Sequence, residues 1–479
     1  MLLLLLLSLA ALISSATGLV RLPARPPAAR LCASSAELFG VDSSSIDRWI
    51  SSSVAEPKDV CVEAFVKADG ELGMRATRAI SKGDVLLSIP IGLCLDAKRA
   101  KTVFDAASTT LSRLRTGDFG LIALLLLYEK ALGSKSKYKE YIQTLPRTAP
   151  GILSWTAAEL DVLYASSTRQ IKSQVDAVED DWTLISSLAD INKIASRESF
   201  TWALGIVKAK HVFVDNQASL VPVLDLISFD PFSGAEPYTA SAGMFGGKIV
   251  KAWADQPYAK GAEVKMSYGL KGSAECVEDH GFCPNVAPAD ACAELKVNLE
   301  ESDRWFDDKV DVLEQQGLPA SNRYDIEADP LAPLDAEMLQ ILRLKSIEGN
   351  DGFILEAVFA QTVFKTMQLP FSKVNEIKVY RYLESNLEKL AALLDSKSTP
   401  EEDAALLSSS SSNAAGGGSN RVTMARLRVQ ERAAVSGALR NVAANLKLLT
   451  TADVNEYYQE RRLRDLDLLR PLDEDEIVN

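Results

Sequence analysis

Hydrophobic and polar positions alternate in short runs from about residue 60 to residue 95. Apolar residues at every second position are typical of strands, and turn residues separate these runs. The strand-like runs lie at 60–66, 74–77 and 85–90, and the turn sequences are Asp69-Gly70 and Lys82-Gly83-Asp84. The same pattern returns at 219–227, 248–253 and 263–267. Short strands joined by tight turns predict a small β domain.

Between these two groups of strands, from about residue 97 to residue 210, the apolar positions follow a helical period. The apolar run at 121–127, followed by Tyr128-Glu129-Lys130, predicts a buried helix because it is too short to span a membrane. The sequence Thr156-Ala157-Ala158-Glu159 predicts a helix start with a capping box. A helical insertion at 97–210 therefore interrupts one β-rich domain, which is expected at 60–290.

After about residue 293 the chain is predicted to be helical, because apolar residues recur at steps of three and four. Helices are expected at 335–346, 350–367, 374–394 and 422–449. Thr399-Pro400-Glu401-Glu402 predicts another helix start, with proline at the first helical position. The run 408–420, rich in Ser, Ala, Gly and Asn, predicts a disordered loop, and the acidic tail 465–479 is expected to fray. The predicted fold class is therefore α+β, with an all-α C-terminal domain at 293–460.

The first forty residues have the composition of a targeting sequence. Residues 1–13 are almost wholly apolar and are followed by small residues up to position 18, as in a signal peptide. Residues 19–40 carry three arginines with Ala, Ser and Pro, and the first acidic residue of the chain is Glu37, as in a transit peptide. The two parts together predict delivery to a plastid, with secretion or an endomembrane lumen as the alternative. No later stretch reaches 18 consecutive apolar residues, so the mature protein is expected to lie outside the membrane.

Charge and cysteine usage exclude some classes of function. The net charge of −13 argues against a sequence-independent grip on nucleic acid, which needs a basic face. The six cysteines include no C-x-x-C pair, and the chain has only two histidines, His211 and His280. No metal centre and no disulfide framework is expected from this pattern. The nearby Cys276, Cys283 and Cys292 are expected to be buried thiols.

Four segments, in order along the chain, resemble the motifs of one protein family. They are ELGMRAT at 71–77 with ISKGDVL at 80–86, WALGIVKAK at 202–210, LVPVLDLI at 220–227, and KGAEVKMSYG at 260–269 followed by Gly281-Phe282 and Asn285. With the helical insertion between them, these segments resemble the SET-domain protein methyltransferases of the Rubisco large-subunit methyltransferase-like family. Residues 293–450 are similar to the helical substrate-binding domain of the same family.

The resemblance implies a reaction and the residues that perform it. Members of the family transfer a methyl group from S-adenosylmethionine to a lysine side chain of a protein, without a metal. Tyr268 matches the catalytic tyrosine of the family, whose hydroxyl orients the acceptor amine. Glu71, Leu72 and Gly73 match the loop whose backbone receives the cofactor. Lys210 stands where relatives carry an arginine near the carboxylate of the cofactor.

Asp225 matches a family aspartate of the cofactor site and substrate channel, but the positions after it depart from the family pattern. Relatives read Asp-x-x-Asn-His, whereas this chain has Ser228 and Phe229. The resemblance implies that the Asn holds the amino-acid end of the cofactor and that the His position contacts adenine through its backbone. Losing one buried polar contact costs roughly 1–3 kcal/mol, or about a tenfold to hundredfold weaker cofactor site. His280 stands where relatives have a tyrosine, and it is expected to line the substrate channel with Phe282.

Three functions are compatible with the sequence. The first is a protein-lysine methyltransferase whose substrate, held by the C-terminal helical domain, is a plastid protein; the family implies Rubisco large subunit or aldolase. The second is a catalytically degenerate protein-binding module, favoured by Ser228-Phe229 and opposed by the retained Tyr268. The third is a protein-histidine methyltransferase. The protein is expected to act as a monomer that binds no nucleic acid.

Overall fold

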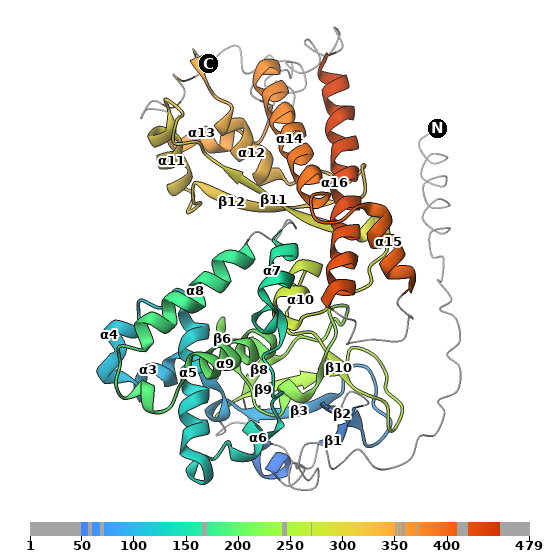
Figure 1. Ribbon diagram of the computed structural model, residues 1–479. Helices are drawn as coiled ribbons and strands as arrows, with labels where there is room; N and C mark the ends of the chain where they lie inside the picture. The colour runs from blue at the N-terminus through green and yellow to red at the C-terminus, as the bar shows by residue number, and fades with distance from the viewer. Residues whose placement is uncertain are drawn as a thin grey trace, which may run out of the picture. The chain divides into compact units, whose positions relative to one another are not determined.

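The computed structural model describes residues 49–55, 60–67, 71–164, 170–241, 247–269, 271–349, 352, 355, 360–370, 372–409 and 420–450. The predicted signal-like segment 1–18, transit-like segment 19–40 and acidic tail 465–479 lie outside the described residues, as do residues 410–419 of the predicted loop. The described residues all belong to one compact unit, which contains all elements named below (Figure 1).

The strands of the β-rich part are short and form several small sheets (Figure 1). In sheet order they are β1 (Val62–Val66) with β2 (Leu72–Ala76); β3 (Val85–Pro90), β9 (Lys248–Trp253) and β8 (Tyr238–Ser241); β4 (Leu95–Asp96), β6 (Gln217–Leu220) and β5 (His211–Val214); and β10 (Lys265–Met266) with β7 (Ser228–Phe229). The pairs are antiparallel except for β10 and β7, which are parallel. The strands predicted at 85–90 and 248–253 are confirmed.

The strand predicted at 219–227 is wrong beyond its first two residues. β6 ends at Leu220, and the chain then turns through Pro222 and Val223 into the 3-10 turn η7 (Leu224–Leu226). Pro222 has no amide hydrogen to give to a neighbouring strand, and Val223 has a φ of +75°, which is incompatible with a strand. The strand predicted at 263–267 is likewise shorter, because β10 contains only Lys265–Met266.

The helical insertion is confirmed, and its first and last helices begin at Ala97 and end at Lys210 as predicted. Its helices are α3 (Ala97–Val103), α4 (Ser108–Leu111), α5 (Gly117–Leu132), α6 (Lys139–Thr144), α7 (Ala157–Leu163), α8 (Gln170–Ile185) and α9 (Arg197–Lys210). The run 121–127 is buried on all sides of α5, which packs between α3 and α9. Thr156 caps α7 with the predicted capping box, in which its side chain and that of Glu159 each bind the other residue's backbone amide.

The prediction that the C-terminal domain is all-α is wrong, because it contains the antiparallel pair β11 (Cys292–Asn298) and β12 (Ser321–Glu327). Residues 291, 293, 295, 297 and 299 are buried, while those between them are more exposed. This period of two is the signature of a strand with one face on the core. The described helices of this domain are α11 (Phe306–Glu314), α12 (Ala336–Lys345), α13 (Ala360–Thr366), α14 (Lys373–Leu394), α15 (Pro400–Ser409) and α16 (Asn420–Thr450).

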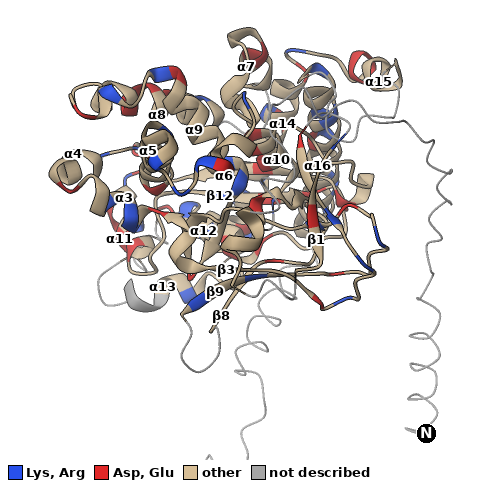
Figure 2. Cartoon of the chain, turned by 90° about the horizontal axis from the view of Figure 1, so that it is seen from below, with Lys and Arg blue, Asp and Glu red and all other residues tan. Residues whose placement is uncertain are grey.

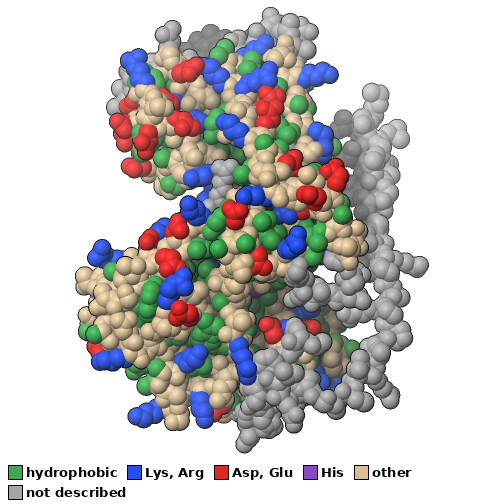
Figure 3. Space-filling view, viewed as in Figure 1, with side chains coloured by type: hydrophobic (Ala, Val, Ile, Leu, Met, Phe, Trp, Pro, Cys, Tyr) green, Lys and Arg blue, Asp and Glu red, His purple; other side chains and the backbone are tan. Residues whose placement is uncertain are grey.

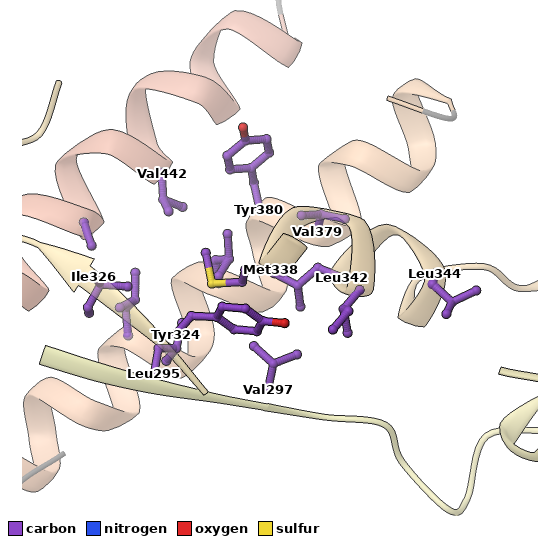
Figure 4. Packing of buried hydrophobic residues seen from close by; sticks show 14 of the residues in the cluster. Leu295, Val297, Tyr324, Ile326, Met338, Leu342, Leu344, Val379, Tyr380 and Val442 are labelled. Atoms are coloured by element: carbon purple, nitrogen blue, oxygen red, sulfur yellow. The ribbon is translucent and has the colours of Figure 1, made fainter. Parts of the chain in front are cut away.

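The strands and helices of the C-terminal domain share one hydrophobic core. Leu295 of β11 lies opposite Tyr324 of β12, and both face Met338 of α12 (Figure 4). Val379 of α14 and Val442 of α16 complete the same cluster. The helices predicted at 335–346, 374–394 and 422–449 are confirmed, whereas the described part of 350–367 holds the short α13.

Helix α16 contributes to two hydrophobic clusters. Near its start, Met424 is buried with Trp155 of the insertion and Val277 of α10 (Ser273–His280). Further along, Val442 belongs to the core of the C-terminal domain. Basic and acidic side chains are interspersed over the described elements seen in Figures 2 and 3. In the described ranges, every helix is too short or too polar to cross a bilayer.

Candidate active site

The segment between β6 and β7 places Asp225 in the interior. Val223, although it is β-branched, has a φ of +75°, and the Leu226 amide donates to its carbonyl to close the η7 turn. A residue in this region costs on the order of 1–3 kcal/mol and persists only where its surroundings impose it. Val223 is fully buried in the core of the β-rich part, which supplies that constraint. The backbone strain therefore lies beside Asp225, as is frequent at functional sites.

Asp225 is buried, with 1% of its surface exposed. Its Oδ2 accepts a hydrogen bond from the Tyr141 hydroxyl at 2.6 Å, and its backbone carbonyl accepts one from Nζ of Lys210 at 2.8 Å. Its Oδ1 has no hydrogen-bond partner among the described residues. Burial raises the pKa of Asp225 to about 6, against the opposing effects of the Lys210 charge and the Tyr141 hydrogen bond. The site therefore offers a buried carboxyl oxygen to a ligand.

Tyr268 follows β10 and lies beside the same turn. The parallel pairing of β10 with β7 places Met266 opposite Phe229. Two residues further along, the Tyr268 hydroxyl donates to the carbonyl oxygen of Ile227. Burial and the nearby charge of Asp225 raise the pKa of Tyr268 well above the usual value for tyrosine. The phenol is therefore a neutral hydrogen-bonding group over the physiological pH range.

Three further rings gather next to Tyr268. Phe229 stacks on His280, with 4.1 Å between ring centroids and 6° between ring planes. The centroid of Phe229 lies 5.6 Å from that of Tyr268 and 6.2 Å from that of Phe282. Nε2 of His280 is buried and has no hydrogen-bond partner in the described part of the chain. Burial, assisted by the charge of Lys271, lowers the pKa of His280 to about 3, so the ring is neutral at neutral pH.

Two residues expected to hold the amino-acid end of the cofactor already have partners within the protein. The Ser228 hydroxyl donates to Oε1 of Glu263 at 2.6 Å, and the Lys210 ammonium donates to the Asp225 carbonyl. An ammonium carries three hydrogens and a hydroxyl oxygen can also accept, so both groups retain bonding capacity. They can bind a ligand without giving up these contacts.

The first of the four motifs is joined to the site through β2. The Val264 amide donates to the Met74 carbonyl at 2.9 Å, which ties β2 to the segment that leads into β10. Leu72 packs against the hydrophobic cluster that contains Tyr268. The expected cofactor loop and the expected catalytic tyrosine therefore belong to one packed unit.

Glu71 and Gly73 of this loop have structural roles of their own. Glu71 forms an ion pair with Lys67 across the β1–β2 turn, at 3.2 Å. A Cβ at Gly73 would lie 3.1 Å from the Phe65 ring and 3.2 Å from the Lys67 side chain. The space at this position is therefore tight for a larger residue, and the role of Glu71, Leu72 and Gly73 in cofactor binding stays a prediction.

The structure brings together most of the predicted site residues and adds one that sequence reasoning missed. Asp225, Phe229, Tyr268, His280 and Phe282 come from three separate segments of the chain. Tyr141 was missed because it lies in the helical insertion, 84 residues before Asp225. Nothing in the sequence around residue 141 distinguishes it from an ordinary core tyrosine.

The chemistry of this cluster fits S-adenosylmethionine, which combines a sulfonium cation with an amino-acid end. Aromatic faces such as those of Phe229, Tyr268 and Phe282 attract cations. The remaining hydrogens of Lys210 can donate to the carboxylate of the amino-acid end. The residues present are therefore compatible with the cofactor that the resemblance implies.

Comparisons with known proteins agree with this picture. The Rubisco LSMT substrate-binding family model matches residues 300–434. The chain is 28% identical over 439 residues to the chloroplastic [fructose-bisphosphate aldolase]-lysine N-methyltransferase of Arabidopsis thaliana, covering 87% of this chain and 84% of that protein. It is also 28% identical over 417 residues to the chloroplastic Rubisco large subunit N-methyltransferase of Nicotiana tabacum, covering 83% and 80%.

More distant relatives and a solved structure complete the comparison. The actin-histidine N-methyltransferase of Homo sapiens is 25% identical over 440 residues, covering 86% of this chain and 69% of that protein. The crystal structure of the SET domain of LSMT bound to lysine and AdoHcy superposes with a TM-score of 0.72 at 25% identity, covering 91% of this chain and 97% of that one. Over most of its length the chain is thus similar to SET-domain protein methyltransferases related to the Rubisco large-subunit methyltransferase, and residues 300–434 match the Rubisco LSMT substrate-binding family.

Proposed function

We propose that the protein is a protein-lysine N-methyltransferase that uses S-adenosylmethionine. The observation that carries the proposal is the neutral, buried phenol of Tyr268 in one cluster with Asp225, whose Oδ1 has no partner among the described residues. This pair provides a hydroxyl and a carboxyl oxygen that can both hydrogen-bond the nitrogen of an acceptor side chain.

The residues of the site favour transfer mainly by positioning. When bound, S-adenosylmethionine supplies an electrophilic methyl group. The acceptor must be a neutral amine, although free lysine has a pKa of about 10.4. Exclusion of water from the buried site, together with the positive charge of the bound cofactor, would disfavour the ammonium. Tyr268 and Asp225 hold the amine in one orientation, which replaces a bimolecular encounter by a fixed geometry.

The proposed substrate is a plastid protein, with Rubisco large subunit and fructose-bisphosphate aldolase as the candidates. The support is the identity with the two chloroplastic relatives and the match of residues 300–434 to the substrate-binding family model. The C-terminal domain would hold this substrate, and the protein would act as a monomer. The plastid location proposed here rests on those relatives together with the targeting composition of residues 1–40.

A histidine acceptor is the second candidate function, favoured by the 25% identity with actin-histidine N-methyltransferases. An imidazole has an ordinary pKa of about 6.5 and is already largely neutral at physiological pH. Its second nitrogen needs a hydrogen-bond partner while the first is methylated, and the free Oδ1 of Asp225 can accept that N–H. The same geometry therefore admits either acceptor.

Incubation with labelled S-adenosylmethionine, followed by mass spectrometry of the product, tests the proposal. Purified Rubisco large subunit, aldolase and actin are the acceptors. We expect the wild-type protein to label a lysine, and Tyr268→Phe to be slower by roughly 10²-fold, the scale of losing one preorganised hydrogen bond. Label on a histidine would select the second candidate.

Tyr258→Phe is the matched control, because this tyrosine is also buried in the core of the β-rich part, where its hydroxyl contacts Lys265. Its rate should stay close to that of the wild type. Equal labelling by wild type and Tyr268→Phe would remove the catalytic assignment. Absence of S-adenosylmethionine binding in calorimetry, traced to Ser228 and Phe229, would instead identify a degenerate protein-binding module.

A further inference from the structure

Two side chains of the helical insertion reach Asp225: Lys210 of α9 binds its backbone carbonyl, and Tyr141 binds its carboxyl group. This tyrosine lies on α6, is fully buried, and donates its hydroxyl hydrogen to Oδ2 of Asp225 at 2.6 Å. That length is typical of a hydrogen bond from a hydroxyl to an ionised carboxylate, which is about twice as strong as a neutral one. The core of the insertion and the η7 turn are thus joined at the carboxyl group of Asp225.

Trp49 fixes the Tyr141 ring from the other side. The two rings stack with 6.1 Å between centroids and 15° between planes. The indole N–H of Trp49 donates to the carbonyl of Lys137, just before α6, at 3.2 Å. The ring of Tyr141 therefore has neighbours on its face as well as at its hydroxyl, and its position is set before any ligand enters.

We propose that Tyr141 is a positioning residue for methyl transfer, whose hydroxyl holds the Asp225 carboxylate so that Oδ1 remains free for the nitrogen of the acceptor side chain. The proposal rests on the function proposed above. It assigns a role in acceptor binding to the helical insertion, which carries none of the expected catalytic residues.

Besides the nearby backbone amides of Val223 and Asp225, the Tyr141 hydroxyl is the described group that holds the Asp225 carboxylate. Rotation about the Cβ–Cγ bond of an aspartate is soft, and the two oxygens are equivalent until one of them is bound. The hydrogen bond from Lys210 goes to the backbone carbonyl of Asp225 and not to its carboxyl oxygens. Among the described residues, the Tyr141 hydroxyl binds one carboxyl oxygen and leaves the other unpartnered.

The same hydrogen bond also favours the ionised form of Asp225. Burial raises the pKa of this carboxyl, while the Lys210 ammonium on α9, the Tyr141 hydroxyl and the backbone amides of Asp225 and Val223 lower it. The Tyr268 phenol also lies close enough to the carboxylate to feel its charge. Tyr141 itself is buried beside Asp225, Tyr268 and Tyr138, and burial raises its pKa well above its ordinary value. Its hydroxyl therefore stays protonated and remains a donor throughout the working pH range. Removing it raises the pKa of Asp225.

The test is Tyr141→Phe, with Tyr138→Phe as the matched control. Tyr138 lies three residues earlier, is equally buried, and contacts Arg99 instead of Asp225. We expect Tyr141→Phe to lower kcat/KM for the acceptor protein about tenfold to hundredfold, the effect of losing a hydrogen bond to a charged group. The affinity for S-adenosylmethionine should change little. The acid limb of kcat/KM should move to higher pH in Tyr141→Phe and stay in place in Tyr138→Phe.

A carboxyl-carbon NMR titration of Asp225 gives a readout that does not depend on activity. Its pKa should be higher in Tyr141→Phe than in the wild type, while both proteins melt cooperatively. An unchanged titration in folded Tyr141→Phe would overturn the positioning role. If Tyr141→Phe fails to fold, Trp49→Leu provides the second variant, because a loosened Tyr141 ring should shift the same titration in the same direction. Lack of methyl transfer by the wild type on every acceptor would overturn the proposed function instead.

Discussion

The ring of Phe229 lies flat against the imidazole of His280, with 4.1 Å between their centroids. At both positions the sequence departs from the family pattern. Relatives carry a histidine at the first position and a tyrosine at the second. The two departures are therefore in direct contact with each other. In this chain an aromatic ring and an imidazole face each other at the two positions.

We therefore predict that Phe229 and His280 are energetically coupled. Phe229→His and His280→Tyr each disrupt the stack, whereas the double variant restores a histidine facing an aromatic ring. The loss of unfolding free energy in the double variant should be smaller than the sum of the two single losses, by about 0.5–1.5 kcal/mol. Denaturant unfolding of all four proteins measures this coupling energy.

A control for this cycle is Phe232→His, three residues away. Phe232 is 67% exposed, so the same replacement there should change the unfolding free energy little and should add independently to His280→Tyr. Strict additivity of Phe229→His and His280→Tyr would show that the stacking contributes no coupling energy.

The buried Asp225 predicts a specific dependence of stability on pH. Its pKa is raised to about 6 in the folded protein, compared with about 3.9 in an unfolded chain. Between these pH values the folded protein binds more protons than the unfolded one, so the Asp225 contribution to stability falls as pH rises from about 4 to about 6. Asp225→Asn removes this contribution. The unfolding free energy of Asp225→Asn relative to the wild type should therefore increase across that window.

Urea unfolding at several pH values checks this prediction, with Asp308→Asn on α11 as the variant that removes an exposed carboxylate. The comparison uses differences from the wild type, because His280 acts in the opposite direction. Its pKa is lowered to about 3, so its contribution is lost as pH falls from about 6.5. A constant difference between Asp225→Asn and the wild type from pH 4 to pH 7 would contradict the assignment of a raised pKa to Asp225.

Local patterns in the sequence were enough to predict many of the elements. The helical period of the insertion ended at Lys210 in both prediction and structure, and the Thr156–Glu159 capping box formed. Apolar and polar residues also alternate at 291–299, which is a pattern typical of β11. This strand was missed because a helical pattern follows directly after it. The error at 219–227 has another cause, since a positive φ at Val223 depends on tertiary packing and leaves no mark on its hydrophobicity.

Of the candidate site, only the residues that lie in the sequence motifs could be predicted. Asp225 and Tyr268 could be named from their sequence context, but the partner of each could not. The contacts of Tyr141 with Asp225 and of Ser228 with Glu263 join residues 84 and 35 positions apart. Such pairs are fixed by the packing of whole elements. Short strands such as β7 and β10 contain too few residues to show a period of their own.

The C-terminal domain contains a buried ion cluster that should be important for its stability. Asp403 of α15 has 1% of its surface exposed and binds both Arg428 and Arg432 of α16. Asp403→Ala would leave the buried Arg428 without its carboxylate, which typically costs about 3–5 kcal/mol. Glu384→Ala removes one member of the more exposed pair with Arg381 and should change stability by less than about 1 kcal/mol. Thermal unfolding of the two variants should therefore differ clearly, and equal melting temperatures would contradict a stabilising role for the cluster.

The last prediction concerns the contact between α16 and the loop that follows Phe282. Gln430 is buried and donates from Nε2 to the carbonyl of Pro284 at 2.7 Å, and Arg426 donates to the carbonyl of Cys283 at 3.0 Å. Gln430→Ala leaves the Pro284 carbonyl without this donor, so the Phe282 wall of the site should be held less firmly. We expect kcat for methyl transfer to fall several-fold, with little change in KM for the acceptor protein, since Gln430 is buried and adds little to the surface of the domain. Arg440→Ala on the same helix is the control, because Arg440 is exposed and binds only Ser436 among the described contacts. Steady-state kinetics of both variants measure this effect, and circular dichroism verifies that they fold. A raised KM with a wild-type kcat in Gln430→Ala would contradict the coupling.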